Sequence, residues 1–114
     1  MLNGVISLHN VIERNQAQGK YEKEEPLYKR SLAICEKTLG KEHPSVALLL
    51  SNLARLYTAQ GNYAQAEQCY LRSLAIQKKT LRPDHPDVAF TLKNMADLYH
   101  RWSLDTFRTA GIGI

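Results

Sequence analysis

Apolar residues recur every three or four positions along most of this chain, a spacing that predicts helices. The expected helices cover residues 3–18, 21–39, 44–60, 63–81 and 86 to at least 99. Asn3 can cap the first helix, and Gly19 can end it in a left-handed conformation. No stretch shows the alternation typical of a strand, so the sequence predicts an all-α fold.

Pro26 is the one residue that disagrees with this helical pattern. Proline has no backbone donor, and its ring clashes with the preceding turn unless it lies in the first turn of a helix. We therefore expect the second helix to begin late, near Glu24, or to start with a distorted turn.

The same pattern occurs twice with a constant offset. Tyr70 follows Tyr28 by 42 residues (70 − 28 = 42), and the segments 30–34 and 72–76 are identical. A period of this length is typical of a solenoid built from stacked helix pairs. The match fails shortly after Tyr99, so the array ends within its third copy.

The chain is expected to form one domain over residues 1–109, followed by a frayed tail at residues 110–114. Two repeats cover approximately residues 3–40 and 44–82, and a partial third covers residues 86–109. Short loops join the helices, which is typical of antiparallel pairs. The prediction is a short solenoid of about five helices, or about two and a half repeats.

The composition narrows the class of protein. The chain has 114 residues and a net charge of +4 that is spread over mixed charges. It has no run of about 18 apolar residues to span a membrane, and its start does not resemble a secretory signal. Cys35 and Cys69 form no metal or redox motif, so we expect free thiols in a cytoplasmic protein.

One stretch of the chain is biased toward basic residues. Arg72, Lys78, Lys79 and Arg82 follow one another with no acidic residue between them. The favoured interpretation is an exposed face of the repeat. A nucleic-acid patch is the weaker alternative, because the run lacks interleaved aromatic residues and any known motif.

The sequence offers no constellation that predicts an enzyme, a metal site or a cofactor site. His43 and His85 are copies of each other, and each lies just before a proline at a predicted helix start. A capping role explains both residues, whereas catalytic groups normally form a single converging cluster. We expect a protein that is not an enzyme.

Several residues carry a resemblance to a known family. The pattern of large and small residues resembles that of tetratricopeptide repeats at Leu50, Leu53, Ala54, Tyr57, Gly61, Tyr63, Ala66, Tyr70 and Ser73. The linkers at residues 39–47 and 81–89 are similar to those of kinesin light chains and their bacterial relatives. The segment 25–34, with its proline, resembles the bacterial versions of this longer repeat.

The first copy departs from the pattern. Arg14 and Asn15 stand where the second copy has Leu56 and Tyr57, and Glu24 replaces a small residue. The outer repeats are therefore degenerate, and we expect the chain to be a fragment of a longer array or a protein whose ends need covering.

The resemblance also implies a binding site. In tetratricopeptide proteins the first helix of each repeat lines a concave surface on which ligand peptides lie. The expected groove residues are Asn10, Ser51, Asn52, Arg55, Lys93, Asn94 and Asp97. The predicted function is a protein–protein interaction module that binds a peptide segment in this groove.

Three of these residues form a ladder of amides, Asn10, Asn52 and Asn94. An amide both donates and accepts hydrogen bonds, so a ladder can hold an extended peptide backbone. Arg55 and Lys93 can pair with carboxylates; in kinesin light chains a similar groove accepts short acidic peptides, so the resemblance implies an acidic partner. Alternatively, each asparagine bonds a neighbouring helix, and the two interpretations are not exclusive.

A second hypothesis is self-assembly through the last helix, which lacks a polar closing helix. The face expected to meet another copy, as in a homodimer, is apolar and includes Leu92, Met95 and Tyr99, with Trp102 beyond it. Trp102 is either an exposed anchor or, as we favour, a plug over the last helix.

Overall fold

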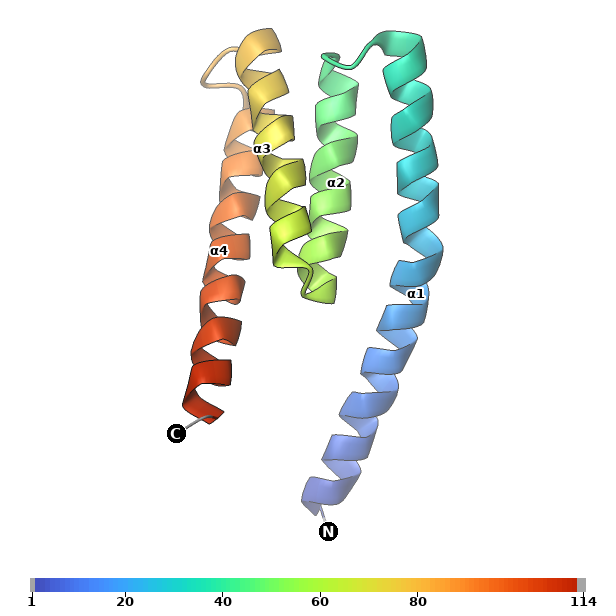
Figure 1. Cartoon of the computed structure of the whole chain (residues 1–114), viewed down its shortest axis with the longest axis vertical. Helices are drawn as coiled ribbons and strands as arrows, with labels where there is room; N and C mark the ends of the chain where they lie inside the picture. The colour runs from blue at the N-terminus through green and yellow to red at the C-terminus, as the bar shows by residue number, and fades with distance from the viewer. Residues whose placement is uncertain (1, 113–114) are drawn as a thin grey trace.

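The computed structural model describes the backbone of residues 2–112 and the side chains of residues 18–107. It contains four helices, namely α1 (Leu2–Leu39), α2 (Pro44–Gln60), α3 (Tyr63–Thr80) and α4 (Pro86–Ile112) (Figure 1). The described residues include no strand, so the all-α prediction is confirmed. None of the described helices is long and apolar enough to cross a membrane.

The prediction of five helices is wrong, because the first two expected helices form one helix, α1. Gly19 lies inside α1 and does not end it; the glycines with a positive φ in the described chain are Gly40 and Gly61. A glycine inside a helix costs only about 1 kcal/mol. Folding back at Gly19 would need an apolar first arm, and Arg14 and Asn15 interrupt that arm.

The expectation for Pro26 is also wrong, since Pro26 lies in the interior of α1. The helix continues through it and loses one backbone hydrogen bond. The ring of Pro26 is exposed, so it crowds no neighbouring helix.

The capping prediction for the two histidines is confirmed. The Ser45 amide donates to His43 Nδ1 at 3.0 Å, and the Asp87 amide donates to His85 Nδ1 at the same distance. Each bond satisfies a donor that the first turn of a helix leaves free. Gly61 then ends α2 in the left-handed conformation, with φ of 82°.

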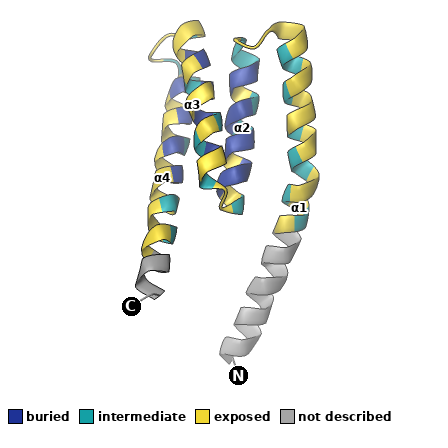
Figure 2. Cartoon of the chain, in the orientation of Figure 1, coloured by how far each residue is buried: buried dark blue, intermediate teal, exposed yellow. Residues whose placement is uncertain are grey.

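α2 is the central element of the array. It packs against the three other helices, whereas α1 and α4 lie at the two ends (Figure 1). Its buried residues dominate the core, as Figure 2 shows by the dark blue on α2. Ala54 and Ala66 are fully buried where α2 and α3 approach closely, and Tyr70 fills the adjoining space.

The repeat is visible in its side-chain contacts. The Tyr57 hydroxyl donates to Glu25 Oε1 at 3.0 Å, and the Tyr99 hydroxyl donates to Glu67 Oε2 at 2.7 Å. Tyr99 follows Tyr57, and Glu67 follows Glu25, by the same 42 residues (99 − 57 = 42 and 67 − 25 = 42). The contact of α4 with α3 therefore copies the contact of α2 with α1.

α4 extends well past Tyr99, the residue that the sequence predicts it to reach at the least. Its backbone remains helical to Ile112, beyond the start of the predicted tail at residue 110. Trp102 is half-buried and stacks on Tyr63 with ring centroids 5.9 Å apart, so it packs between α4 and α3 and is not an exposed anchor. Met95 lies in the core, so the prediction that it belongs to an open face is wrong.

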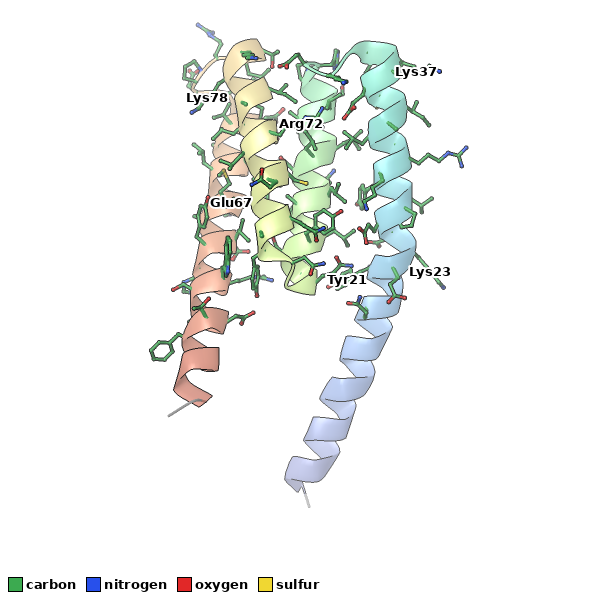
Figure 3. All side chains as sticks on the ribbon, in the orientation of Figure 1. Tyr21, Lys23, Lys37, Glu67, Arg72 and Lys78 are labelled. Atoms are coloured by element: carbon green, nitrogen blue, oxygen red, sulfur yellow. The ribbon has the colours of Figure 1, made fainter. Side chains whose placement is uncertain are left out.

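The basic run is partly paired. Arg72 lies 2.9 Å from Glu36 of α1, and Lys79 lies 3.6 Å from Glu42. These pairs join α3 to α1 and to the loop that follows α1; Figure 3 labels Arg72 on α3. They neutralise half of the run, which weakens the nucleic-acid alternative.

Candidate functional site

A groove of about 370 Å³ lies where α1, α2 and α4 converge. Its lining residues are Tyr21, Glu24 and Tyr28 from α1, Asn52, Arg55, Leu56, Thr58 and Ala59 from α2, Tyr70 from α3, and Asn94, Asp97 and Arg101 from α4. Four residues of the predicted site are among them. The pattern of helix pairs thus places polar side chains of two successive repeats in one hollow.

Asn52, Arg55, Asn94 and Asp97 line this groove, as the sequence predicts. They occupy equivalent positions on α2 and α4, because Asn94 follows Asn52 at the repeat offset and Asp97 follows Arg55. Asn10 lies outside the residues whose side chains are described.

Ser51 does not line the groove, contrary to the sequence-based expectation. It is buried between helices, where its hydroxyl is 2.8 Å from that of Ser73 and 3.4 Å from that of Thr91. Ser51 precedes Asn52, and one residue turns a helix by about 100°. That rotation directs Ser51 toward α3 and leaves Asn52 on the concave side.

Lys93 is likewise absent from the groove lining, for the same geometric reason. It occupies on α4 the position that Ser51 occupies on α2, and its side chain is exposed. Arg101, one turn beyond Asp97, is the cationic residue of α4 that lines the groove.

The side-chain amide nitrogen of Asn94 is unsatisfied in the described groove. Asn94 Nδ2 is buried and has no hydrogen-bond partner among the described residues. A buried donor without a partner costs about 1–3 kcal/mol. Because this nitrogen is covered, a ligand acceptor would bond it only after the Asn94 side chain turns toward the groove. Among the described residues, no neighbouring helix accepts a hydrogen bond from this nitrogen.

Charges in the groove are of both signs. Arg101 Nε is 3.2 Å from Asp97 Oδ2, which is an exposed pair within one turn of α4. Arg55 instead lies over the Phe90 ring, 5.8 Å from its centroid, and pairs with no carboxylate in the described part of the chain. A cation–π contact holds a guanidinium in place and leaves its donors available.

Tyr70 closes the floor of the groove. Burial raises the pKa of its hydroxyl to about 12, although a hydrogen bond with Thr58 and the charge of Arg55 act in the opposite direction. The hydroxyl therefore stays neutral at ordinary pH and can donate or accept a hydrogen bond.

The wall contributed by α1 was missed by the sequence analysis. Tyr21 lies between α1 and the lower end of α2 (Figure 3). Tyr28, about two turns further along α1, lines the same groove. The repeat carried the necessary signal, because Tyr21 and Tyr28 are the counterparts of Tyr63 and Tyr70. The prediction assigned concave positions only to the first helix of each repeat.

These features define a class of protein: a short helical-repeat module with a concave groove and a core repeated from one helix pair to the next. A family model of the tetratricopeptide repeat matches residues 5–79 and again residues 45–104. The chain belongs to the tetratricopeptide repeat family. Repeats of this family generally mediate contacts between proteins, and the family is a non-enzymatic repeat module.

Proposed function

We propose that this chain binds a peptide segment of a partner protein in the groove between α1, α2 and α4. The observation that carries the proposal is the convergence of Asn52 and Asn94 with Arg55 in one hollow, with the buried Asn94 Nδ2 unpartnered among the described residues. Two amides at successive repeats match the donors and acceptors of an extended peptide backbone.

We propose an acidic peptide as the preferred ligand. Arg55 has no carboxylate partner among the described residues, and Phe90 holds its guanidinium at the groove. A ligand carboxylate at this point would gain a charge-assisted hydrogen bond. The walls formed by Tyr21 and Tyr28 suit an aromatic side chain beside that carboxylate.

Two finer assignments accompany this proposal. The linkers at residues 39–47 and 81–89 support a repeat of the kinesin-light-chain type in a bacterial-like version, with the proline at position 26. The sparse and unpaired Cys35 and Cys69 support a reducing, cytoplasmic setting. Burial raises the pKa of the Cys69 thiol, which keeps it unreactive.

A peptide array tests the proposal. The probe is a set of short synthetic peptides that carry acidic residues around one aromatic residue, and binding is measured by titration calorimetry on the best member. The variant that combines Asn52→Ala with Asn94→Ala should lose binding while its helical circular dichroism stays unchanged.

The matched control removes the same number of amides from an exposed surface. Gln65→Ala with Gln68→Ala on α3 should bind like the parent protein, since neither glutamine lines the groove. If the groove variant binds like the control, or if no acidic peptide binds and a basic set does, the proposal is wrong.

Self-assembly through the last helix is the second candidate. The observation in its favour is the exposure of Leu92 and Tyr99, at 50% and 43%. The homodimer expected from the sequence used Met95 as well, and Met95 is part of the core. Self-association through α4 must therefore use a surface that does not include Met95.

A further inference from the structure

α4 carries an open face whose counterpart on α2 is completely covered. On α2 the residues that meet α3 are all buried: Ala47, Leu50, Ser51, Ala54 and Thr58. Their counterparts on α4 are all exposed: Ala89, Leu92, Lys93, Ala96 and His100. We call this set the α4 face. It is the surface of a first helix beside which the described residues place no second helix.

α1 carries the complementary open face. On α3 the residues that meet α2 include Ser73 and Ile76, which are fully buried, with 0% and 2% exposure. Their counterparts are Ser31, which is exposed, and Ile34, which is 53% exposed. Leu27 lies on the same side and is 64% exposed. We call Leu27, Ser31 and Ile34 the α1 face.

We propose that two copies of this chain associate head to tail, with the α1 face of one copy packed on the α4 face of the next as α3 packs on α2. The chain itself contains the model for this contact, because α1 and α3 share the sequence of residues 30–34 and 72–76. Ile34 is the counterpart of Ile76, and Leu92 is the counterpart of Leu50, with the same residue type in each case. Ile76 and Leu50 belong to one core cluster of the α2–α3 pair.

One polar contact of the α2–α3 pair can be formed again in this arrangement. Ser73 Oγ donates to the Ala47 carbonyl at 2.7 Å. The counterparts are Ser31 of one copy and the Ala89 carbonyl of the other. Two residues of opposite charge also replace uncharged counterparts in the α2–α3 pair. Glu24, one turn before Leu27 on α1, corresponds to Ala66, and Lys93 in the α4 face corresponds to Ser51.

The shape of the molecule favours the same arrangement. The first half of α1 and the second half of α4 both project past the turn between α2 and α3, at opposite ends of the array (Figure 1). In an antiparallel pair of α4 with the next copy's α1, these two projections lie side by side. The contact is heterologous, so each added copy leaves one α1 face and one α4 face open.

The ion pairs between neighbouring repeats indicate how strong this contact is. Arg72 pairs with Glu36 and Lys79 pairs with Glu42 within the chain. The corresponding contacts between copies join Lys37 to Asp84, which attract, and Arg30 to Lys78, which repel. One attraction and one repulsion make the association weaker than the packing inside the chain.

Charged substitutions on the two faces test the proposal by analytical ultracentrifugation. The parent protein should gain mass steadily with concentration, beyond twice the monomer mass. Leu92→Glu and Ile34→Glu should each be monomeric, because each blocks one face. Ala75→Glu, an exposed position on α3 away from both faces, should associate like the parent protein.

The decisive sample is a mixture of the two blocked variants. Leu92→Glu retains an intact α1 face and Ile34→Glu retains an intact α4 face, so the mixture should form a one-to-one dimer that grows no further. A dimer formed by one blocked variant alone, a mixture that stays monomeric, or a parent protein that is monomeric at every concentration would each overturn the proposal.

A gain of association provides an independent check that loss of folding cannot imitate. Lys78→Glu should pair with Arg30 of the next copy as Glu36 pairs with Arg72, and should tighten association roughly threefold or more. Lys78→Gln only removes the repulsion, so it should associate more tightly than the parent protein and less tightly than Lys78→Glu. Unchanged or weaker association in Lys78→Glu would contradict the head-to-tail geometry.

Discussion

Gln77 is a fully buried residue of α3 whose side-chain amide is unsatisfied. Neither its nitrogen nor its oxygen has a hydrogen-bond partner among the described residues. Burying such a group without partners costs about 1–3 kcal/mol. Cys35 occupies the equivalent position on α1, so the repeat accepts a less polar residue there.

We predict that Gln77→Leu increases the free energy of unfolding by about 1 kcal/mol or more, because it removes the unsatisfied amide and keeps most of the volume. Urea unfolding followed by circular dichroism measures the change. Gln68→Leu, at an exposed position on the same helix, should change little. A lower stability for Gln77→Leu would show that the amide has partners in solution.

The two histidine caps allow a paired prediction at the residue scale. His43→Ala and His85→Ala should each lower the free energy of unfolding by about 1 kcal/mol, because each leaves a first-turn amide without its acceptor. Similar losses in urea unfolding would support equivalent roles. No loss in either variant would mean that water replaces the imidazole at no cost.

At the scale of the element, α1 is the helix that most changes the sequence-based picture. If α1 is a single helix, Gly19 has a right-handed helical backbone. If the chain instead turns back at Gly19, this glycine has a left-handed backbone. The helical conformation suits alanine better than glycine, whereas the left-handed conformation strains any residue with a Cβ atom.

Gly19→Ala should therefore raise the helical ellipticity of the protein, with a gain in stability of at most about 1 kcal/mol. The Cβ atom of alanine would meet no neighbouring atom. The matched variant is Gly61→Ala, where φ is +82° and the expected result is a loss of roughly 1–2 kcal/mol. A loss of helicity in Gly19→Ala would favour the hairpin.

The helices that end at strong local signals could be predicted from sequence. α2 has the expected bounds, Pro44–Gln60, because a histidine and proline start it and Gly61 ends it. The continuity of α1 could not be predicted, since helical spacing is the same on both sides of Gly19. That outcome depends on whether residues 3–18 find a surface to pack on.

For the groove, too, the repeat pattern predicts some lining residues, while others depend on how the helices pack. Asn52, Arg55, Asn94 and Asp97 lie where the repeat places them, and their role in binding remains a proposal. Ser51 could not be separated from Asn52 by composition, because both are small and polar. Only the packing of α3 against α2 decides which of the two is buried.

At the scale of the whole molecule, one repeat pattern produces both a groove and two open ends. The groove lies where successive first helices meet the α1 wall, and the open ends lie at α1 and α4 (Figure 1). A ligand in the groove would contact α1, α2 and α4 together. Binding should therefore stabilise the contact of α1 with the rest of the array.

The most direct test of the central claim is the map of amide chemical-shift changes when the best acidic peptide is added to the isotope-labelled protein. We predict the largest changes at Tyr28, Asn52, Arg55 and Asn94, which come from three helices and line the same groove. Changes confined to the α1 face, the α4 face or the outer side of α3 would contradict this claim.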